Sequence, residues 1–189
     1  PKPAAALYAS QCDGAPVLEV ASAMDIGDYP AGRIGRVAVF TNADEVRLYK
    51  NDVFVTRLHQ GGYAALPHPP MVLDDTIGQL LETQEGFPKR KAGRLRSCLL
   101  AAGKYGLAAM PLRYKAALVF CMVRYGMTLA DGVALYNQYV GNWGGEATRW
   151  RFDAVRNGEV VASSTRSPSA KLHLEVIPAS DTLTEGDSY

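Results

Sequence analysis

Residues 36–58 alternate between apolar and polar positions and predict three short strands joined by two tight turns. Val37, Val39 and Thr41 share one face of the first strand, and their β-branched side chains suit a pleated, half-buried surface. The second strand places Val46 and Leu48 inward, with polar side chains between them facing outward. Three strands cannot bury an apolar face alone, so the rest of the chain must supply a second layer.

Turn signals separate these strands. Asn42-Ala43-Asp44 forms a turn cluster after the first strand, and Asn51-Asp52 is a two-residue hairpin signal before residues 53–56. A further strand is predicted within residues 15–23. Residues 1–14 are rich in alanine and proline and are predicted to be a connector without regular structure.

Helical spacing replaces the alternation between residues 70 and 141 and predicts four helices. Asp74 or Asp75 caps the first, Pro88 opens the second and Pro111 opens the third. Thr128 to Asp131 has the spacing of a variant capping box and opens the fourth, which ends at Gly141. The apolar residues predicted to face inward are Leu73, Ile77, Leu80 and Leu81, then Leu95, Leu99 and Ala102, and then Leu112, Ala116, Val119, Phe120 and Val123.

Strand patterning returns at Trp150. Residues 151–163 form the strongest hairpin signal of the chain, around Asn157-Gly158. Residues 172–176 predict a strand with one solvent-exposed face. The predicted fold class is α+β: an immunoglobulin-like antiparallel β-sandwich, residues 15–69 and 142–180, with a four-helix insertion, residues 70–141. Residues 181–189 form a polar tail. Helices gathered in one place argue against a parallel α/β sheet.

Composition and charge argue against several classes of protein. At 189 residues the chain suits one substantial domain, and 20 Lys and Arg against 19 Asp and Glu argue against a dedicated nucleic-acid binder. No apolar run approaches the roughly 20 residues that span a bilayer, so no membrane partner is expected. Cys12, Cys98 and Cys121 lack metal-like spacing, and the last two are predicted to be buried free thiols. Free cysteines favour the cytoplasm, although Pro1 is not a natural start and the sequence is compatible with an upstream signal.

The sequence predicts no catalytic residue, no cofactor and no metal site. His59, His68 and His173 share no ligand spacing, and no phosphate-binding or nucleophile motif is present. Capping explains Asp74-Asp75, and solvated helix faces explain Glu82, Glu85 and the basic run at residues 89–96.

Aromatic residues near the end of the helical block offer candidate sugar contacts. Trp143 and Tyr139 are the candidates for stacking on a sugar ring. Packing in the core is the alternative use of these two residues and of Tyr136 and Trp150.

Four segments of the chain resemble the region that follows the catalytic barrel in glycoside hydrolase family 2, the β-galactosidase and β-glucuronidase group. Residues 1–11 resemble the connector that leaves the barrel, and residues 37–51 resemble a strand pair that these enzymes commonly carry. Asp52 stands where glycine is usual in that pair. Residues 151–161 and 172–187 resemble a later hairpin and the strand and turn that enter the next β-domain. The helical block departs from the plain sandwich of this family.

The resemblance implies a non-catalytic C-terminal accessory domain of a β-galactosidase-like enzyme, with the upstream barrel of the same chain as its partner. In this family the acid/base and the nucleophile are glutamates of the barrel, and no position here matches those motifs. Two alternatives stay open: a carbohydrate-binding module in its own right, and a protein-interaction or nucleic-acid module that works through the basic helix, which the neutral total charge weakens.

Overall fold

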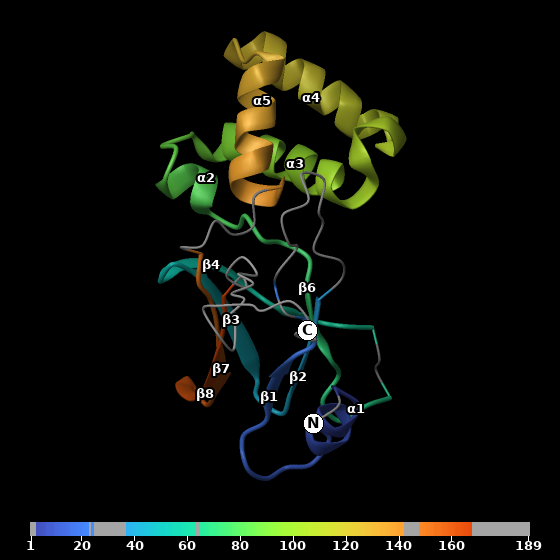
Figure 1. Cartoon of the computed structure of the whole chain (residues 1–189), viewed down its shortest axis with the longest axis vertical. Coiled ribbons are helices and arrows are strands. Elements are labelled where there is room, and N and C mark those ends of the chain that lie inside the picture. The colour runs from blue at the N-terminus through green and yellow to red at the C-terminus, as the bar shows by residue number, and fades with distance from the viewer. Residues whose placement is uncertain (1–2, 23, 25–36, 63–64, 142–147, 168–189) are drawn as a thin grey trace, which may run out of the picture.

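In the computed structural model, the strands and the helices of residues 80–141 occupy separate regions that follow each other along the longest axis of the molecule, and the short N-terminal helix lies beside the strands (Figure 1). The structure describes residues 3–22, 24, 37–62, 65–141 and 148–167. The strands are β1 (Leu18–Val20), β2 (Val37–Thr41), β3 (Glu45–Lys50), β4 (Val53–Arg57), β5 (His59–Gln60), β6 (Met71–Leu73), β7 (Trp150–Arg156) and β8 (Glu159–Arg166). The helices are α1 (Pro3–Ala9), α2 (Leu80–Thr83), α3 (Lys89–Ala109), α4 (Leu112–Tyr125), α5 (Leu129–Tyr136) and the π-helical turn η1 (Asn137–Gly141).

The strands form two antiparallel four-stranded sheets, one in the order β1-β2-β6-β5 and the other in the order β4-β3-β7-β8. Helices α2 to α5 all lie between β6 and β7 in the sequence. The predicted α+β class is therefore confirmed. The predicted strand at residues 172–176 lies outside the described residues.

The two predicted hairpins are present. Asn51 and Asp52 have φ values of 49° and 64°, and Asn157 and Gly158 have φ values of 53° and 86°. Positive φ at both central residues is the conformation whose twist matches that of the flanking strands. These turns join β3 to β4 and β7 to β8.

The first predicted turn has a different role from the one expected. β2 and β3 were predicted to belong to one three-stranded unit, but they lie in different sheets, so residues 42–44 carry the chain from one sheet to the other. The alternation itself is correct: Val37, Val39 and Thr41 are buried on β2, and Val46 and Leu48 are buried on β3. Alternation fixes which face of a strand is buried, and it carries no information about the strand's partner.

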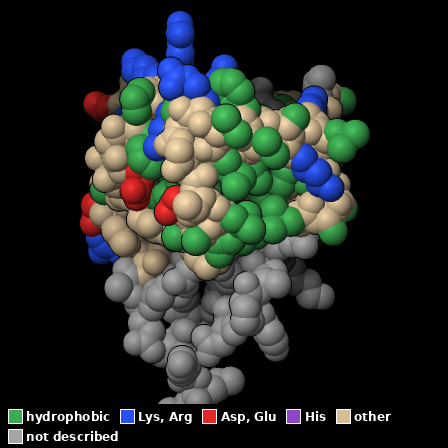
Figure 2. Space-filling model, turned by 90° about the horizontal axis from the view of Figure 1, so that it is seen from above, with side chains coloured by type: hydrophobic (Ala, Val, Ile, Leu, Met, Phe, Trp, Pro, Cys, Tyr) green, Lys and Arg blue, Asp and Glu red, His purple; other side chains and the backbone are tan. Residues whose placement is uncertain are grey.

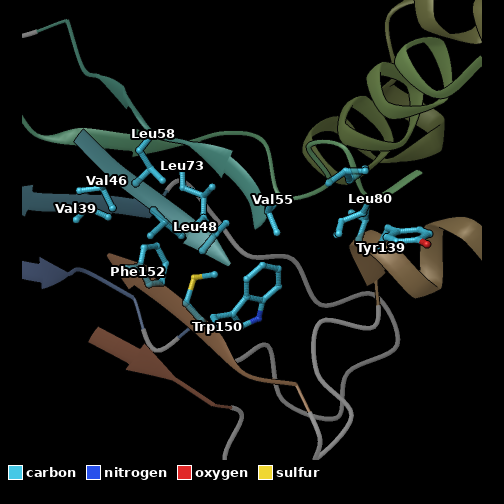
Figure 3. Close-up of a cluster of buried hydrophobic side chains, with 14 of the residues drawn as sticks. Val39, Val46, Leu48, Val55, Leu58, Leu73, Leu80, Tyr139, Trp150 and Phe152 are labelled. Atoms are coloured by element: carbon cyan, nitrogen blue, oxygen red, sulfur yellow. The ribbon is translucent and has the colours of Figure 1, made fainter. Parts of the chain in front are cut away.

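One hydrophobic core joins the two sheets to the helices (Figure 3). Val39 of the first sheet and Leu48 and Phe152 of the second are each fully buried in it. Leu80 and Tyr139 extend this core into the helical region, and Trp150 is buried with them. Buried residues of both sheets and of the helices thus belong to one core, so no strand group buries its apolar face alone.

The first predicted helix is much shorter than expected. Leu73, predicted to face inward from this helix, belongs to β6 and pairs with Val37 of β2, and helix α2 begins only at Leu80. Asp75 does cap backbone, but its carboxylate accepts hydrogen bonds from the amides of a turn at Ile77 and Gly78, at 3.0 and 2.8 Å. The segment between β6 and α2 is therefore a capped turn.

Helix α4 turns a different face inward from the one predicted. Leu112, Ala116, Val119, Phe120 and Val123 are all exposed, and Phe120 has 44% of its surface accessible. The stripe that packs inward consists of Tyr114, Ala117, Leu118, Cys121, Met122 and Tyr125, which are buried or half-buried. Both stripes have the helical spacing of three and four residues, and residues 116–123 are all apolar, so the sequence fits either phase.

Other helix boundaries follow the sequence signals. Helices α3 and α4 begin directly after Pro88 and Pro111, and Gly126 ends α4 in the left-handed conformation. The capping box of Thr128 and Asp131 opens α5. Residues 3–9, predicted to belong to a connector, form helix α1, because its alanine-rich sequence has high intrinsic helix propensity.

Candidate functional site

Tyr139, one of the two candidate sugar contacts, lies in the core. It is 3% exposed, and its hydroxyl donates to Glu85 Oε1 at 2.5 Å. Burial, together with the hydrogen bond and the charge of Glu85, raises the pKa of this phenol well above its ordinary value. The ring has no free face on which a sugar could stack, so the prediction for Tyr139 is wrong.

Of the remaining aromatic candidates, Tyr136 is half-buried and packs against the core, and neither tryptophan offers an exposed ring among the described residues. Trp143 lies outside them. Trp150 is 1% exposed, and the Lys50 ammonium lies 5.4 Å from the centre of its ring. Burial lowers the pKa of Lys50. The predicted alternative, packing in the core, is thus correct for Tyr139 and Trp150.

Several acidic side chains of the described residues serve turns, caps and ion pairs. Asp52 accepts from Arg149 and, at 2.6 Å, from Arg151, and Glu45 pairs with Arg47 and with Arg57 at 2.5 and 2.8 Å. Asp131 caps α5, which lowers its pKa through the hydrogen bonds from Thr128. These carboxylates lie on strand faces and at element ends, whereas hydrolysis of a glycoside needs two of them across a cleft.

Metal ligands are not gathered in the described portion of the chain, where no group of three His, Cys, Asp or Glu side chains could hold an ion. His68 Nε2 lies 2.9 Å from Asp13 Oδ1 on the surface. The side chain of His59 and the whole of His173 lie outside the described residues. Among the described helices, none is long and apolar enough by itself to cross a bilayer, and α3 with α4 meets the criteria only as a pair bent by 113°.

A cavity of about 300 Å³ lies between α3, α4 and α5. Its walls are apolar: Leu95, Leu99 and Ala102 come from α3, Leu118 and Met122 from α4, and Val133 and Tyr136 from α5. Leu107, Leu129 and Val133 border it and are 59%, 60% and 45% exposed, so they form an apolar rim that is open to solvent. The sequence pattern indicated buried helix faces but gave no sign that they enclose an empty space.

Two thiols line this cavity. Cys98 and Cys121 are buried and free, as predicted, and the Cys98 thiol contacts the carbonyl oxygen of Tyr114 at 3.7 Å. Burial, with a smaller effect of Cys121, raises the pKa of Cys98 from 9.0 to about 11. Burial also raises the pKa of Cys121, against the opposing charges of Arg94 and Lys91. Both groups are therefore protonated at neutral pH and are poor nucleophiles.

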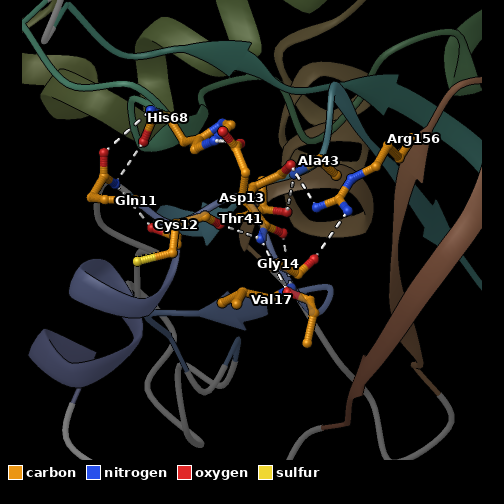
Figure 4. Close-up of polar contacts among 12 residues, drawn as sticks. Gln11, Cys12, Asp13, Gly14, Val17, Thr41, Ala43, His68 and Arg156 are labelled. Carbon is orange, nitrogen blue, oxygen red and sulfur yellow. Dashed lines mark hydrogen bonds and ion pairs between the residues drawn. The ribbon is translucent and has the colours of Figure 1, made fainter.

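A polar network ties the N-terminal segment to both sheets (Figure 4). Asn42, at the crossing between the sheets, donates from Nδ2 to the carbonyl oxygens of Cys12 and Ala15 at 2.9 and 3.0 Å. Its Oδ1 accepts from the amide of Val17 at 3.0 Å. Arg156, at the end of β7, donates to the carbonyl oxygens of Gly14 and Asn42 at 3.2 and 3.0 Å.

Gln11 completes this network on the other side of the segment. Its Nε2 donates to the His68 carbonyl oxygen at 2.9 Å, and its Oε1 accepts from the His68 amide at 3.2 Å. Asn42 is buried, and its three bonds satisfy its own side-chain amide, which would otherwise be buried without partners. The sequence identified Asn42 only as a turn residue, because its partners lie about 25 to 30 residues away along the chain.

The described residues thus form two candidate sites, an apolar cavity among the helices and a hydrogen-bonded attachment of residues 11–17 to the sheets. No protein-family model matches the chain, and a search of curated proteins finds no match.

Proposed function

We propose that this chain is a non-catalytic accessory domain of a family 2 glycoside hydrolase, β-galactosidase-like, that braces the catalytic barrel of the same enzyme. In this proposal the two sheets are an immunoglobulin-like sandwich, and helices α2 to α5 are an insertion between its strands. The sequence resemblance supplies the family, and the two antiparallel sheets with a shared core are compatible with it.

The observation that carries the proposal is the attachment of the N-terminal segment. The resemblance assigns residues 1–11 to the connector that leaves the barrel. Gln11 and the backbone of residues 12–17 are held to both sheets by Asn42, His68 and Arg156. A connector bound in this way transmits the position of one domain to the next, whereas an accessory module on a flexible linker needs no such contacts.

Binding of carbohydrate by the chain itself is the weaker alternative, because Tyr139 and Trp150 are buried. The exposed apolar side chains of α4 support the other alternative, a protein-interaction module. Seen from the helical end, hydrophobic side chains form a broad area with Lys and Arg at its edges (Figure 2).

The test uses the full-length product of the gene that encodes this chain. We expect the coding sequence upstream of Pro1 to contain a barrel with two catalytic glutamates, and the full-length protein to release nitrophenol from an aryl β-galactoside. Residues 1–189 alone should release none, because the resemblance places the catalytic glutamates in the barrel and the described residues carry no carboxylate pair of the required kind. Absence of a barrel, or a full-length protein inactive on aryl galactosides, glucosides and glucuronides, would refute the proposal.

Two variants of the full-length protein test the bracing role. Asn42→Ala removes the hydrogen bonds to residues 12–17, and the exposed Ser97, which bonds only within α3, provides the control Ser97→Ala. We expect Asn42→Ala to lower the temperature at which glycosidase activity is lost, with KM unchanged. Equal inactivation temperatures for the two variants would show that the attachment does not brace the barrel.

A further inference from the structure

The cavity between α3, α4 and α5 has the size and the chemistry of a ligand site. Its volume of about 300 Å³ lies at the lower end of the range of roughly 300–1,000 Å³ for small-molecule pockets. All of its lining residues are uncharged. An ionised ligand would therefore lose its hydration without gaining a charged partner, which excludes strongly charged molecules.

The polar side chains of the lining leave two groups free to form hydrogen bonds, the Tyr136 hydroxyl and the Cys121 thiol, and the thiol is the weaker of the two. Thr128 Oγ1 is already engaged with the backbone amide and the carboxylate of Asp131, and Cys98 contacts the Tyr114 carbonyl. The Tyr136 hydroxyl has no hydrogen-bond partner among the described residues. A buried water needs two to four polar partners, so this lining suits an apolar molecule with a single polar atom better than it suits water.

The walls are held open by backbone geometry as well as by side chains. Gly106, which lines the cavity, has φ 73° and ψ 160°, a conformation that is essentially restricted to glycine. It interrupts α3 and redirects the chain, so that Leu107 reaches the rim and Met110 is buried beside the cavity. The rim gives a ligand a path into the space without unfolding of the helices.

We propose that this cavity binds a small, uncharged, predominantly apolar molecule that carries one hydrogen-bonding atom, which contacts Tyr136. The ligand class is that of aromatic or aliphatic alcohols and phenols. This binding goes beyond the accessory role and does not depend on it.

Two helical glycines provide a matched pair of variants. Gly132 lines the cavity, and a Cβ atom added there meets nothing within 4 Å, so Gly132→Leu places a side chain at the cavity without a clash of its Cβ. Gly93 on α3 also has free space around an added Cβ, but it does not line the cavity, so Gly93→Leu is the control. Both changes replace glycine by a residue of higher helix propensity and should preserve the fold, which circular dichroism checks.

Binding of 2-naphthol and of naphthalene to the whole chain is measured by equilibrium dialysis. We expect saturable binding of 2-naphthol to wild type and to Gly93→Leu with the same Kd, and a Kd at least about tenfold higher for Gly132→Leu. Tyr136→Phe should raise the Kd of 2-naphthol by about threefold to tenfold, the effect of one lost hydrogen bond. The Kd of naphthalene, which has no hydroxyl, should not change.

A second readout places the ligand independently of affinity. Saturating 2-naphthol should slow the reaction of Cys98 and Cys121 with a maleimide and leave the exposed Cys12 unaffected. Absence of saturable binding to wild type would overturn the proposal. Equal affinity of Gly132→Leu and Gly93→Leu for 2-naphthol would overturn it as well, because the probe would then bind elsewhere. Maleimide reaction rates of Cys98 and Cys121 that do not change when 2-naphthol is added would overturn it for the same reason.

Discussion

Gly78 is the position where a single added carbon should disturb the fold most. It lies in the turn between β6 and α2, has φ 51°, and a Cβ atom built on it would lie 1.7 Å from the carbonyl oxygen and 2.5 Å from the carbonyl carbon of Val55. These are backbone atoms of β4, and the Val55 side chain is 1% exposed in the core. The clash therefore cannot be relieved by rotation of a flexible side chain.

The expected effect of Gly78→Ala has two components. The left-handed conformation disfavours any residue with a Cβ by about 1–2 kcal/mol. Overlap with a packed backbone adds an overpacking term of about 1–3 kcal/mol. We therefore expect the free energy of unfolding to fall by about 2–5 kcal/mol, a large fraction of the stability of an ordinary domain.

Gly126 provides the control, because it separates the two components. It has φ 61°, and an added Cβ meets nothing within 4 Å, so Gly126→Ala should lose only the conformational component. Urea unfolding followed by circular dichroism measures both variants against wild type. Losses that agree within about 0.5 kcal/mol would refute the close approach of Gly78 to β4, since the two variants would then share the same cause.

Three further predictions concern the helical region. Phe120→Ala should lower the free energy of unfolding by less than about 1 kcal/mol because Phe120 is exposed, whereas Leu95→Ala, at a site 1% exposed, should lower it by about 2–5 kcal/mol in the same urea assay. In native protein at pH 7, Cys12 should be the one fast-reacting thiol with a disulfide reagent, and Cys98 and Cys121 should react completely but much more slowly, at a rate that denaturant raises; three equal fast rates would contradict the burial of the pair. The pKa of Asp131 in the folded state lies below its ordinary value of 3.8, so the stabilisation from its cap is present above that value and is lost as the pH falls through the folded-state pKa. Thermal melts between pH 2 and 6 should accordingly show a weaker acid dependence for Asp131→Asn than for wild type, and identical pH profiles would contradict this.

Local signals in the sequence predicted local structure well. Asn51-Asp52 and Asn157-Gly158 adopt the positive φ values that their hairpins require, and the capping box of Thr128 begins α5. Each of these signals acts within four residues of the chain, so neighbouring residues contain all the information. The buried faces of β2 and β3 were predictable for the same reason.

Features that depend on distant contacts were not predictable from these patterns. The placement of β2 and β3 in different sheets depends on pairing with β6 and β7, and the crossing depends on Asn42 binding residues 12–17. Helix α2 begins only after Gly78, which adopts a positive φ against the backbone of β4, and the spacing of leucines does not reveal that contact. Tyr139 illustrates the same limit at the candidate site, since its partner Glu85 lies 54 residues earlier.

The phase of α4 could not be decided by hydrophobicity, and a contact from α3 explains the outcome. The Arg94 guanidinium lies 4.4 Å from the centre of the Phe120 ring, so this exposed aromatic side chain has a cation over its face. Lys91 lies in the same way 3.7 Å from the ring of Phe87. Some of the basic residues at 89–96 therefore cover aromatic rings, a use that differs from the solvated face predicted for them.

The nearly neutral total charge of the chain is a poor guide to the surface of the helices. Nine of its 20 Lys and Arg residues lie between residues 89 and 130, where there is no Asp or Glu. Among the described residues, Arg96 is the one member of this group that forms an ion pair, with Asp75 at 3.5 Å. Like charges oppose the approach of two such surfaces, so these cations disfavour contact between the exposed apolar faces of α4 in two copies of the chain.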